Sequence, residues 1–240
     1  MTTSQIAQAI QDELEAYSDP SRIVKIAADH PTSMRVLGLK VADMRKVIDL
    51  WRKKLSTFTD EQWIDLATEL VDKDVLECQI VAYEFLWENK KVLDALTANQ
   101  ILALGINLDN WASVDIYCTC ITGYSWRKGK LQDQDIENWA RSENRWLRRT
   151  ALVSTVPLNL RARGGTGDAV KTLAICNLLV SDKDDMVVKA LSWALRELSK
   201  SDREAVTGFM ELHQGRLHPR VKREVETKLR TGKKMVKQNT

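Results

Sequence analysis

The chain has 240 residues, a formal net charge of +3, and only four prolines and ten glycines. No run of 18 residues lacks a charged side chain, which excludes a membrane-spanning helix of ordinary composition. The length fits one large domain or two small ones. Abundant Leu, Ala, Glu, Lys and Arg favour helices throughout.

The N-terminal residues 1–17 form an amphipathic, acidic pattern that predicts a helix and does not resemble a signal peptide. Apolar residues then recur at intervals of three and four, as in residues 41–51, and we find no convincing strand. Short polar stretches at 17–21, 29–38 and 161–167 predict the main loops.

Residues 109–118, DNWASVDIYC, predict the start of a helix with Asp109 as its cap. Asp115 follows Trp111 by four residues, so the carboxylate and the indole share one face of that helix. A carboxylate beside a tryptophan in a largely apolar helix is the first candidate for a functional group.

Four predicted helices carry a polar residue in a similar frame, and aligning them brings Gln79, Asp115, Arg149 and Lys189 into register. The separations are 36, 34 and 40 residues, and each interval fits a helix, a turn and a second helix. Such a period is typical of an α-solenoid of the HEAT type. In a solenoid the equivalent positions of successive second helices line one surface, so the four residues would form a polar row along a groove.

Trp193 follows Lys189 by four residues, as Asp115 follows Trp111. One interpretation is that the two tryptophans flank the row as aromatic walls. The alternative is that both are ordinary core residues, which is the usual position of tryptophan in helical proteins.

Charge is unevenly distributed along the chain. Residues 1–125 contain 12 Lys and Arg against 19 Asp and Glu, a net charge of −7, whereas residues 126–240 contain 24 against 14, a net charge of +10. A basic C-terminal half favours an anionic partner such as nucleic acid, and a merely solvated basic surface is the alternative.

Arginines are concentrated in residues 139–152, which form one continuous helix or, if Ser142 is a cap, two helices with the second starting near Asn144. The guanidinium group binds phosphate with several donors in a planar fork. The arginines of this segment are Arg141, Arg145, Arg148 and Arg149. The basic region is extended by Arg161, Arg163 and Arg196, and by Lys222, Arg223, Lys228, Arg230, Lys233 and Lys234.

Other chemistries lack support in the sequence. The four cysteines show neither a disulfide framework nor the spacing of a zinc site, and we interpret them as small core residues. The three histidines are scattered, and no glycine-rich loop follows a strand. We therefore expect no metal and no cofactor.

Four segments together resemble one known family, the AlkD family of DNA alkylation repair enzymes, which are alkylpurine DNA glycosylases built of HEAT-like repeats. The resemblance spans about residues 35–230. The segments are LGLKVADMRKVI (37–48), NWASVDIYC (110–118), WARSENRWLRRTAL (139–152) and KALSWALRELSK (189–200).

The resemblance implies hydrolysis of the N-glycosidic bond of cationic bases, such as 3-methyladenine and 7-methylguanine, without insertion of the base into a protein pocket. Trp111 and Trp193 would pack on the backbone at the lesion. Asp115 would stabilise the cationic sugar and position a water, and Arg149 would hold a phosphate. Further DNA contacts are expected from Arg148, Lys189, Arg196, Lys40, Gln79, Arg161 and Arg163.

We thus expect an all-α superhelix of HEAT-like repeats, forming a curved solenoid with a basic concave groove. It would be a single domain over residues 1–230, followed by a basic, flexible tail over 231–240. The expected function is a cytoplasmic, nucleoid-associated, monomeric glycosylase that acts on double-stranded DNA containing alkylated bases, with no membrane and no obligatory protein partner. The alternatives are a non-catalytic binder of damaged, bent or branched DNA, and a protein-binding solenoid.

Overall fold

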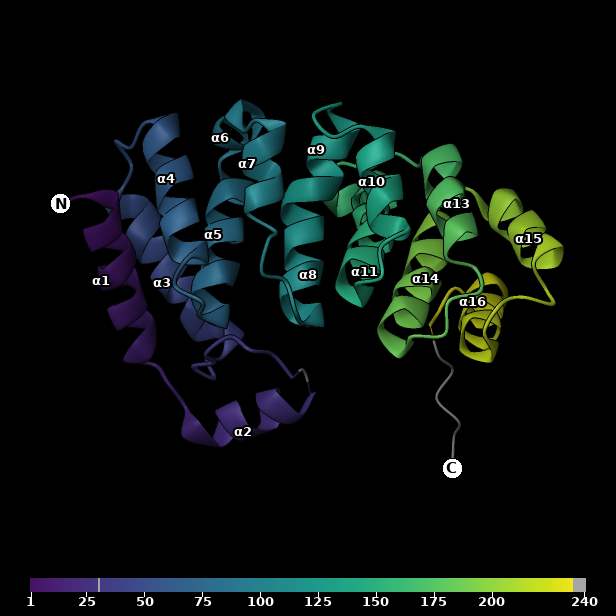
Figure 1. Cartoon of the computed structure of the whole chain (residues 1–240), viewed down its shortest axis with the longest axis horizontal. Helices are drawn as coiled ribbons and strands as arrows, with labels where there is room; N and C mark the ends of the chain where they lie inside the picture. The colour runs from purple at the N-terminus through teal and green to yellow at the C-terminus, as the bar shows by residue number, and fades with distance from the viewer. Residues whose placement is uncertain (30, 235–240) are drawn as a thin grey trace. The chain divides into compact units, whose positions relative to one another are not determined.

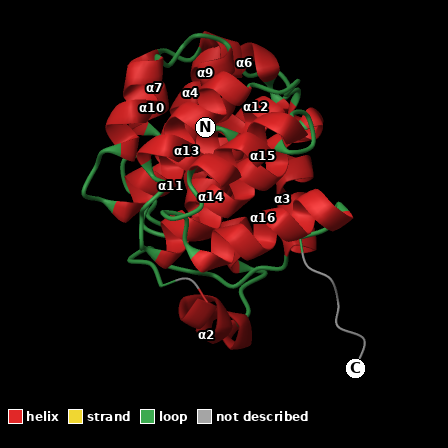
Figure 2. Cartoon of the chain, turned by 90° about the vertical axis from the view of Figure 1, so that its right-hand side faces the viewer, coloured by secondary structure: helices red, strands yellow, loops and turns green. Residues whose placement is uncertain are grey.

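The computed structural model of the chain describes residues 1–29 and 31–234 and confirms the all-α prediction. Within this part of the chain, the one β feature is an isolated bridge between Arg35 and Val75. Helices joined by loops account for the fold that Figure 2 shows.

The chain divides into two compact units, residues 1–121 and 122–240. A π-helical segment, Cys118–Thr122, contains the boundary between them. Because residues 122–125 carry no charge, the first unit has the net charge of −7 and the second that of +10. The prediction of a single domain over residues 1–230 stays a prediction, as do the HEAT assignment and the curved, grooved shape. Of the predicted flexible tail, residues 235–240 lie outside the described residues.

The first unit is built around one enclosed helix, α5, against which α1, α3, α4, α6 and α8 all pack. The helix α2 stands apart from the other helices of this unit (Figure 1). The helices are α1 (Thr3–Glu15), α2 (Pro20–Asp29), α3 (Val41–Lys54), α4 (Asp60–Val71), α5 (Leu76–Glu88), α6 (Lys90–Ala95), α7 (Ala98–Ala103) and α8 (Trp111–Tyr117).

The second unit stacks its helices in two rows, with α10 against α13 in one row, and α11 against α14 and α14 against α16 in the other. The long helix α14 also contacts α12, α13 and α15, so it is the centre of this unit. The helices are α9 (Gly123–Arg127), α10 (Asp133–Ala140), α11 (Arg145–Ser154), α12 (Val156–Asn159), a 3₁₀ turn (Arg161–Arg163), α13 (Ala169–Leu178), α14 (Asp185–Leu198), α15 (Arg203–Leu212) and α16 (Pro219–Thr231).

The four residues of the predicted polar row lie in four separate helices. Gln79 lies in α5, Asp115 in α8, Arg149 in α11 and Lys189 in α14. Within the first unit α5 packs on α8, and within the second α11 packs on α14. Neighbouring members of the register are therefore on adjacent helices in each unit.

Local capping explains several helix ends. Thr2 and Gln5 form a capping box at the start of α1, in which each side chain bonds the other's backbone N–H.

Residues 139–152 form two helices and not one, as the second of the two alternatives predicted. The cap of α11 is Asn144, whose side chain accepts from the Trp146 N–H, and not Ser142.

The four cysteines are free thiols and all are buried, as predicted for core residues. Burial raises the pKa of the Cys78 thiol to about 12, so it stays protonated at neutral pH. None of the helices within the described residues is long and apolar enough to cross a membrane.

Candidate functional site

The start of α8 is fixed by Asn110, not by Asp109 as the sequence suggested. The Asn110 side chain is buried and accepts a hydrogen bond from the Ser113 N–H at 2.9 Å. The carboxylate of Asp109 is instead used by the loop after α2, where it accepts from the Ser33 N–H and the Thr32 hydroxyl. Two adjacent polar residues therefore have separate tasks, one capping the helix and one binding the loop.

Asp109 is held in its charged form by this loop. Partial burial opposes ionisation, but the hydrogen bonds from Ser33 and Thr32 outweigh it and lower the pKa of the Asp109 carboxyl. The Asn110 amide adds a further bond to the Thr32 hydroxyl at 3.3 Å. Residues 32–34 and the first turn of α8 thus form one hydrogen-bonded assembly.

Trp111 and Asp115 follow this anchored start and lie one helical turn apart. Both are partly exposed, unlike the core tryptophan Trp126, which is 1 % exposed. The Trp111 indole N–H lies 3.4 Å from the carbonyl of Asp29, at the end of α2. The structure therefore favours a surface position over a core position for Trp111.

Lys40 lies on the surface at the start of α3, just after a turn that is held from inside. The buried carboxylate of Glu77 accepts from the backbone N–H groups of Leu37, Gly38 and Leu39 at 2.8–3.3 Å. Gly38 has a φ of +80°, and a Cβ there would lie 2.6 Å from the Asp19 carbonyl, so glycine is required. The position of this turn therefore determines where the Lys40 side chain reaches the surface.

The predicted DNA contact of Gln79 is not supported, because its side chain is 1 % exposed. The reason is the position of α5, which has other helices on several sides and no free face at this residue. Gln79 therefore has the register of the predicted polar row, but its side chain is enclosed in the first unit.

In the second unit, Arg149 is buried, with 5 % of its surface exposed. Its Nη1 donates to the carbonyl of Met186 in the first turn of α14, at 2.6 Å. The guanidinium thus lies against the helix that also carries Lys189 and Trp193.

Arg148 is bonded within the protein, and its expected DNA contact stays a prediction. Its Nε donates to Asp182 at 2.7 Å, and its Nη1 donates to the carbonyls of Ser142 and Glu143. Three guanidinium N–H donors of Arg148 are thereby bonded to the protein's own loops. Arg148 connects the turn before α11 with the turn before α14.

Lys189 and Trp193 lie one turn apart on α14, and each is partly exposed. The Lys189 ammonium pairs with Asp185 at 2.7 Å. The hydrogen bond from Lys189, together with the charge of Arg220, lowers the pKa of the Asp185 carboxyl. Trp193, like Trp111, is not part of the fully buried core.

Arg196 is turned toward α16, and its expected DNA contact stays a prediction. Its Nε donates to the Ser192 hydroxyl at 3.1 Å and lies 3.7 Å from Glu224. Only 14 % of its side chain is exposed, and burial lowers the pKa of its guanidinium. This arginine neutralises a buried carboxylate.

The glycine-containing loop after α12 is closed by Arg127, whose guanidinium donates to the carbonyls of Pro157 and Arg163. Arg161 is exposed and lines a cavity of about 390 Å³ together with Thr166 and Lys200. Arg163 is partly buried. Of the two, Arg161 is the better placed to contact an anion in solution.

Sequence reasoning missed the groups that hold the site in place, namely Glu77, Asn110, Asp182 and Arg127. An Asp-Asn pair just before a helix was a usable signal for two tasks, since either side chain can cap. The partners of Glu77 are 38 or more residues away and those of Arg127 are 30 or more residues away, so no local pattern points to them. Within the described residues no cluster of three His, Cys, Asp or Glu side chains could hold a metal ion.

Comparison with known proteins gives a consistent result. A model of the family described as DNA alkylation repair enzyme matches residues 10–229. A solved structure titled a predicted DNA alkylation repair enzyme from Enterococcus faecalis superposes with a TM-score of 0.69 at 18 % identity. The match covers 89 % of this chain and 97 % of the other, and at this identity it supports the fold alone. No curated protein matches the sequence.

Proposed function

Because the chain belongs to the DNA alkylation repair enzyme family, we propose that it is a glycosylase that releases cationic alkylated purines from double-stranded DNA. Membership of the family gives a role in DNA alkylation repair with DNA as the substrate. The proposal adds the reaction, hydrolysis of the N-glycosidic bond, and the base class, such as 3-methyladenine and 7-methylguanine. The protein would act as a monomer on the nucleoid in the cytoplasm.

The observation that carries the proposal is the pairing of Trp111 and Asp115 on one face of α8. A carboxylate is an unusual group at a DNA contact, because it repels phosphate. It suits a cation, and the sugar of a departing purine develops positive charge at C1′ in the transition state. The indole one turn away also favours a cation at its face.

The chemistry follows from the charge of the alkylated base. The C1′–N bond breaks with its electron pair passing to the base, which leaves neutral and needs no proton from an acid. A water oxygen then bonds to C1′, and its proton passes to Asp115 or to solvent. One carboxylate suffices where ordinary glycoside hydrolysis uses two.

The remaining site residues have supporting roles in this proposal. Trp193 packs on the DNA backbone near the lesion. Lys40, Lys189 and Arg161 supply further phosphate contacts, as surface cations do in most DNA complexes. Gln79, Arg148, Arg149 and Arg196 are given no phosphate contact in this proposal, because each is buried or bonded within the protein.

The decisive experiment measures base release from a duplex with a single 7-methylguanine by the wild-type chain and by Asp115→Asn. The substitution keeps the shape and removes the charge, so we expect a loss of on the order of 10²–10³-fold in single-turnover rate. Duplex affinity should stay the same or rise slightly, because a negative charge is removed.

Two results would contradict the assignment. Equal release by both forms would remove Asp115 from the chemistry. Binding by the wild-type chain with no release would instead favour a non-catalytic binder of damaged or branched DNA.

A further inference from the structure

The charged residues of α16 lie on two faces, one packed against the protein and one facing an open groove. On the inner face Glu224 accepts from the Ser192 hydroxyl at 2.7 Å and lies within 4 Å of both Arg196 and Arg220. Arg220 also pairs with Asp185 of α14. Buried charges on this side of the helix are therefore compensated within the protein.

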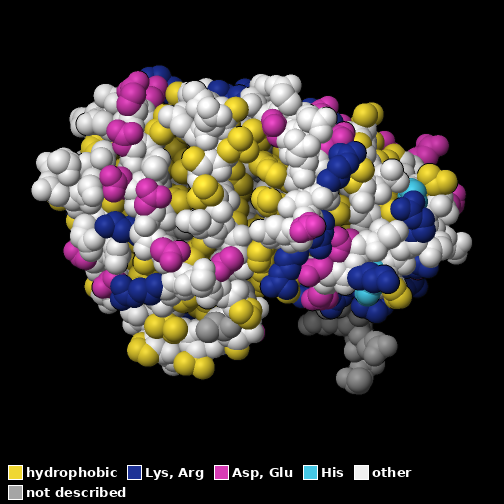
Figure 3. Space-filling model, in the orientation of Figure 1, with side chains coloured by type: hydrophobic (Ala, Val, Ile, Leu, Met, Phe, Trp, Pro, Cys, Tyr) yellow, Lys and Arg dark blue, Asp and Glu magenta, His cyan; other side chains and the backbone are white. Residues whose placement is uncertain are grey.

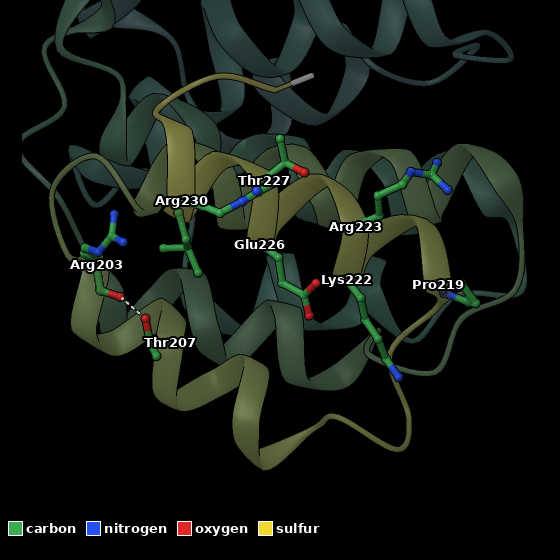
Figure 4. Close-up of a pocket in the computed structure, with 9 residues that line it drawn as sticks. Arg203, Thr207, Pro219, Lys222, Arg223, Glu226, Thr227 and Arg230 are labelled. Carbon is green, nitrogen blue, oxygen red and sulfur yellow. Dashed lines mark hydrogen bonds between the residues drawn. The ribbon is translucent and has the colours of Figure 1, made fainter. Parts of the chain in front are cut away.

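The other side of α16 is basic and lines an open groove shared with α15. The groove has a volume of about 990 Å³ (Figure 4). Among the described residues its four cations have no ion-pair partner, and Glu226 is its single carboxylate. The lining cations are Arg203 of α15 and Lys222, Arg223 and Arg230 of α16.

The groove exists because α15 and α16 both pack against α14. Figure 4 shows Lys222 and Glu226 extending from α16 toward the α15 side. Thr207 and Thr227 add hydroxyl groups to the lining. Figure 3 shows further Lys and Arg side chains over α11, α14 and α16 of the same unit.

We propose that the α15–α16 groove binds the phosphate backbone of duplex DNA, as a contact surface separate from the residues assigned to the lesion. The proposal rests on DNA being the substrate in the proposed function. Lys222 and Arg230 are eight residues apart, which is about 12 Å along a helix. About three or four phosphates of one DNA strand occupy that length of duplex axis, so the spacing suits a polymer better than a single small anion.

The test is the salt dependence of binding to an undamaged duplex by a variant that removes three of the cations, Arg203→Gln/Lys222→Gln/Arg230→Gln. If each contacts a phosphate, the slope of log affinity against log salt becomes shallower by about 2–3, and affinity near 0.1 M salt falls on the order of tenfold. Glu226→Gln should act in the opposite direction and tighten binding about 2–3-fold. An unfolded protein would not produce that gain.

The matched control is Arg45→Gln/Lys53→Gln/Lys91→Gln, which makes the same change in net charge at exposed positions of the first unit. It should lower affinity by no more than about 2–3-fold, through the long-range field alone, against about tenfold for the groove variant, and it should leave the slope nearly unaltered. The proposal is overturned if the groove variant binds with the wild-type affinity and slope, or if the control loses as much as the groove variant.

The two proposals fail in different ways. If the wild-type chain releases 7-methylguanine and the groove variant binds duplex DNA normally, the groove proposal is wrong and the glycosylase proposal stands. If the wild-type chain has no salt-dependent affinity for DNA, both proposals are wrong. Competition by inorganic phosphate at millimolar concentration, without any effect of the variants on duplex binding, would also overturn the groove as a DNA surface.

Discussion

Exposure separates the tryptophans of this chain into two groups. Trp126 is 1 % exposed, and its indole N–H donates to Asp133 at 2.7 Å. Trp111 and Trp193 are partly exposed and each lies one helical turn from a charged residue. Sequence alone left both positions open between core and surface, because the spacing of a tryptophan does not say which side of its helix is covered.

Substituting Trp193 by alanine should therefore weaken DNA binding more than it weakens the fold. Loss of one aromatic stacking surface costs about 1–3 kcal/mol, so affinity for a lesion duplex should fall at least about fivefold. Trp126→Ala, the core control, should lower the free energy of unfolding by about 3–5 kcal/mol. Urea unfolding and duplex titration measure the two quantities. A Trp193→Ala protein as unstable as Trp126→Ala would assign Trp193 to packing.

Charged residues show where prediction from sequence was reliable and where it was not. Their helices and register followed from periodicity, and Arg149 and Lys189 do lie on adjacent helices. Whether a side chain points outward depends on the neighbours of its helix, which are distant in sequence. Arg148 and Arg196 are therefore engaged by Asp182 and Glu224, and their types and spacing gave no sign of it.

At the scale of the elements, the first turn of α8 and the loop after α2 depend on each other. Asp109 binds the loop and Asn110 caps the helix, while the same Thr32 hydroxyl contacts both. Trp111 is the next residue, so its position is determined by this assembly. Sequence predicted the helix and its approximate start, but the assignment of the cap needed the loop in place.

Asp109→Ala should destabilise the first unit by about 1–3 kcal/mol, because the Ser33 N–H and Thr32 hydroxyl lose a charged acceptor. The effect should depend on pH. The folded-state pKa of Asp109 is lowered, so its contribution is present above the unfolded pKa near 4 and is lost as pH falls through the folded value. The difference in unfolding free energy between wild type and variant should therefore shrink between about pH 5 and pH 3.

Asp109→Asn is the control for this prediction, since it keeps one oxygen acceptor and does not titrate. The stability difference between Asp109→Asn and Asp109→Ala should be flat over the same pH range. A wild-type advantage over Asp109→Ala that stays constant down to pH 3 would show that the carboxylate charge is not what holds the loop.

For the whole molecule, charge asymmetry is the property that sequence predicted most directly. The boundary between the units falls in an uncharged stretch, so the acidic and basic halves coincide with the two units. The basic groove between α15 and α16 lies in the second unit, as does Arg149. In the acidic first unit, phosphate is attracted only where local cations such as Lys40 outweigh the surrounding carboxylates.

This asymmetry predicts that neutralising acidic residues remote from the site accelerates encounter with DNA. Asp49 and Asp65 are exposed on α3 and α4, and Asp49→Asn/Asp65→Asn removes two negative charges from the first unit. Because the long-range field sets the association rate, we expect a rate constant about 2–3-fold higher at 0.05 M salt. At 0.5 M salt screening confines the field to a few ångströms, and the rates of wild type and variant should converge. Stopped-flow association with a labelled duplex at both salt concentrations measures this, and equal rates at low salt would mean that the field of the first unit does not reach the approaching DNA.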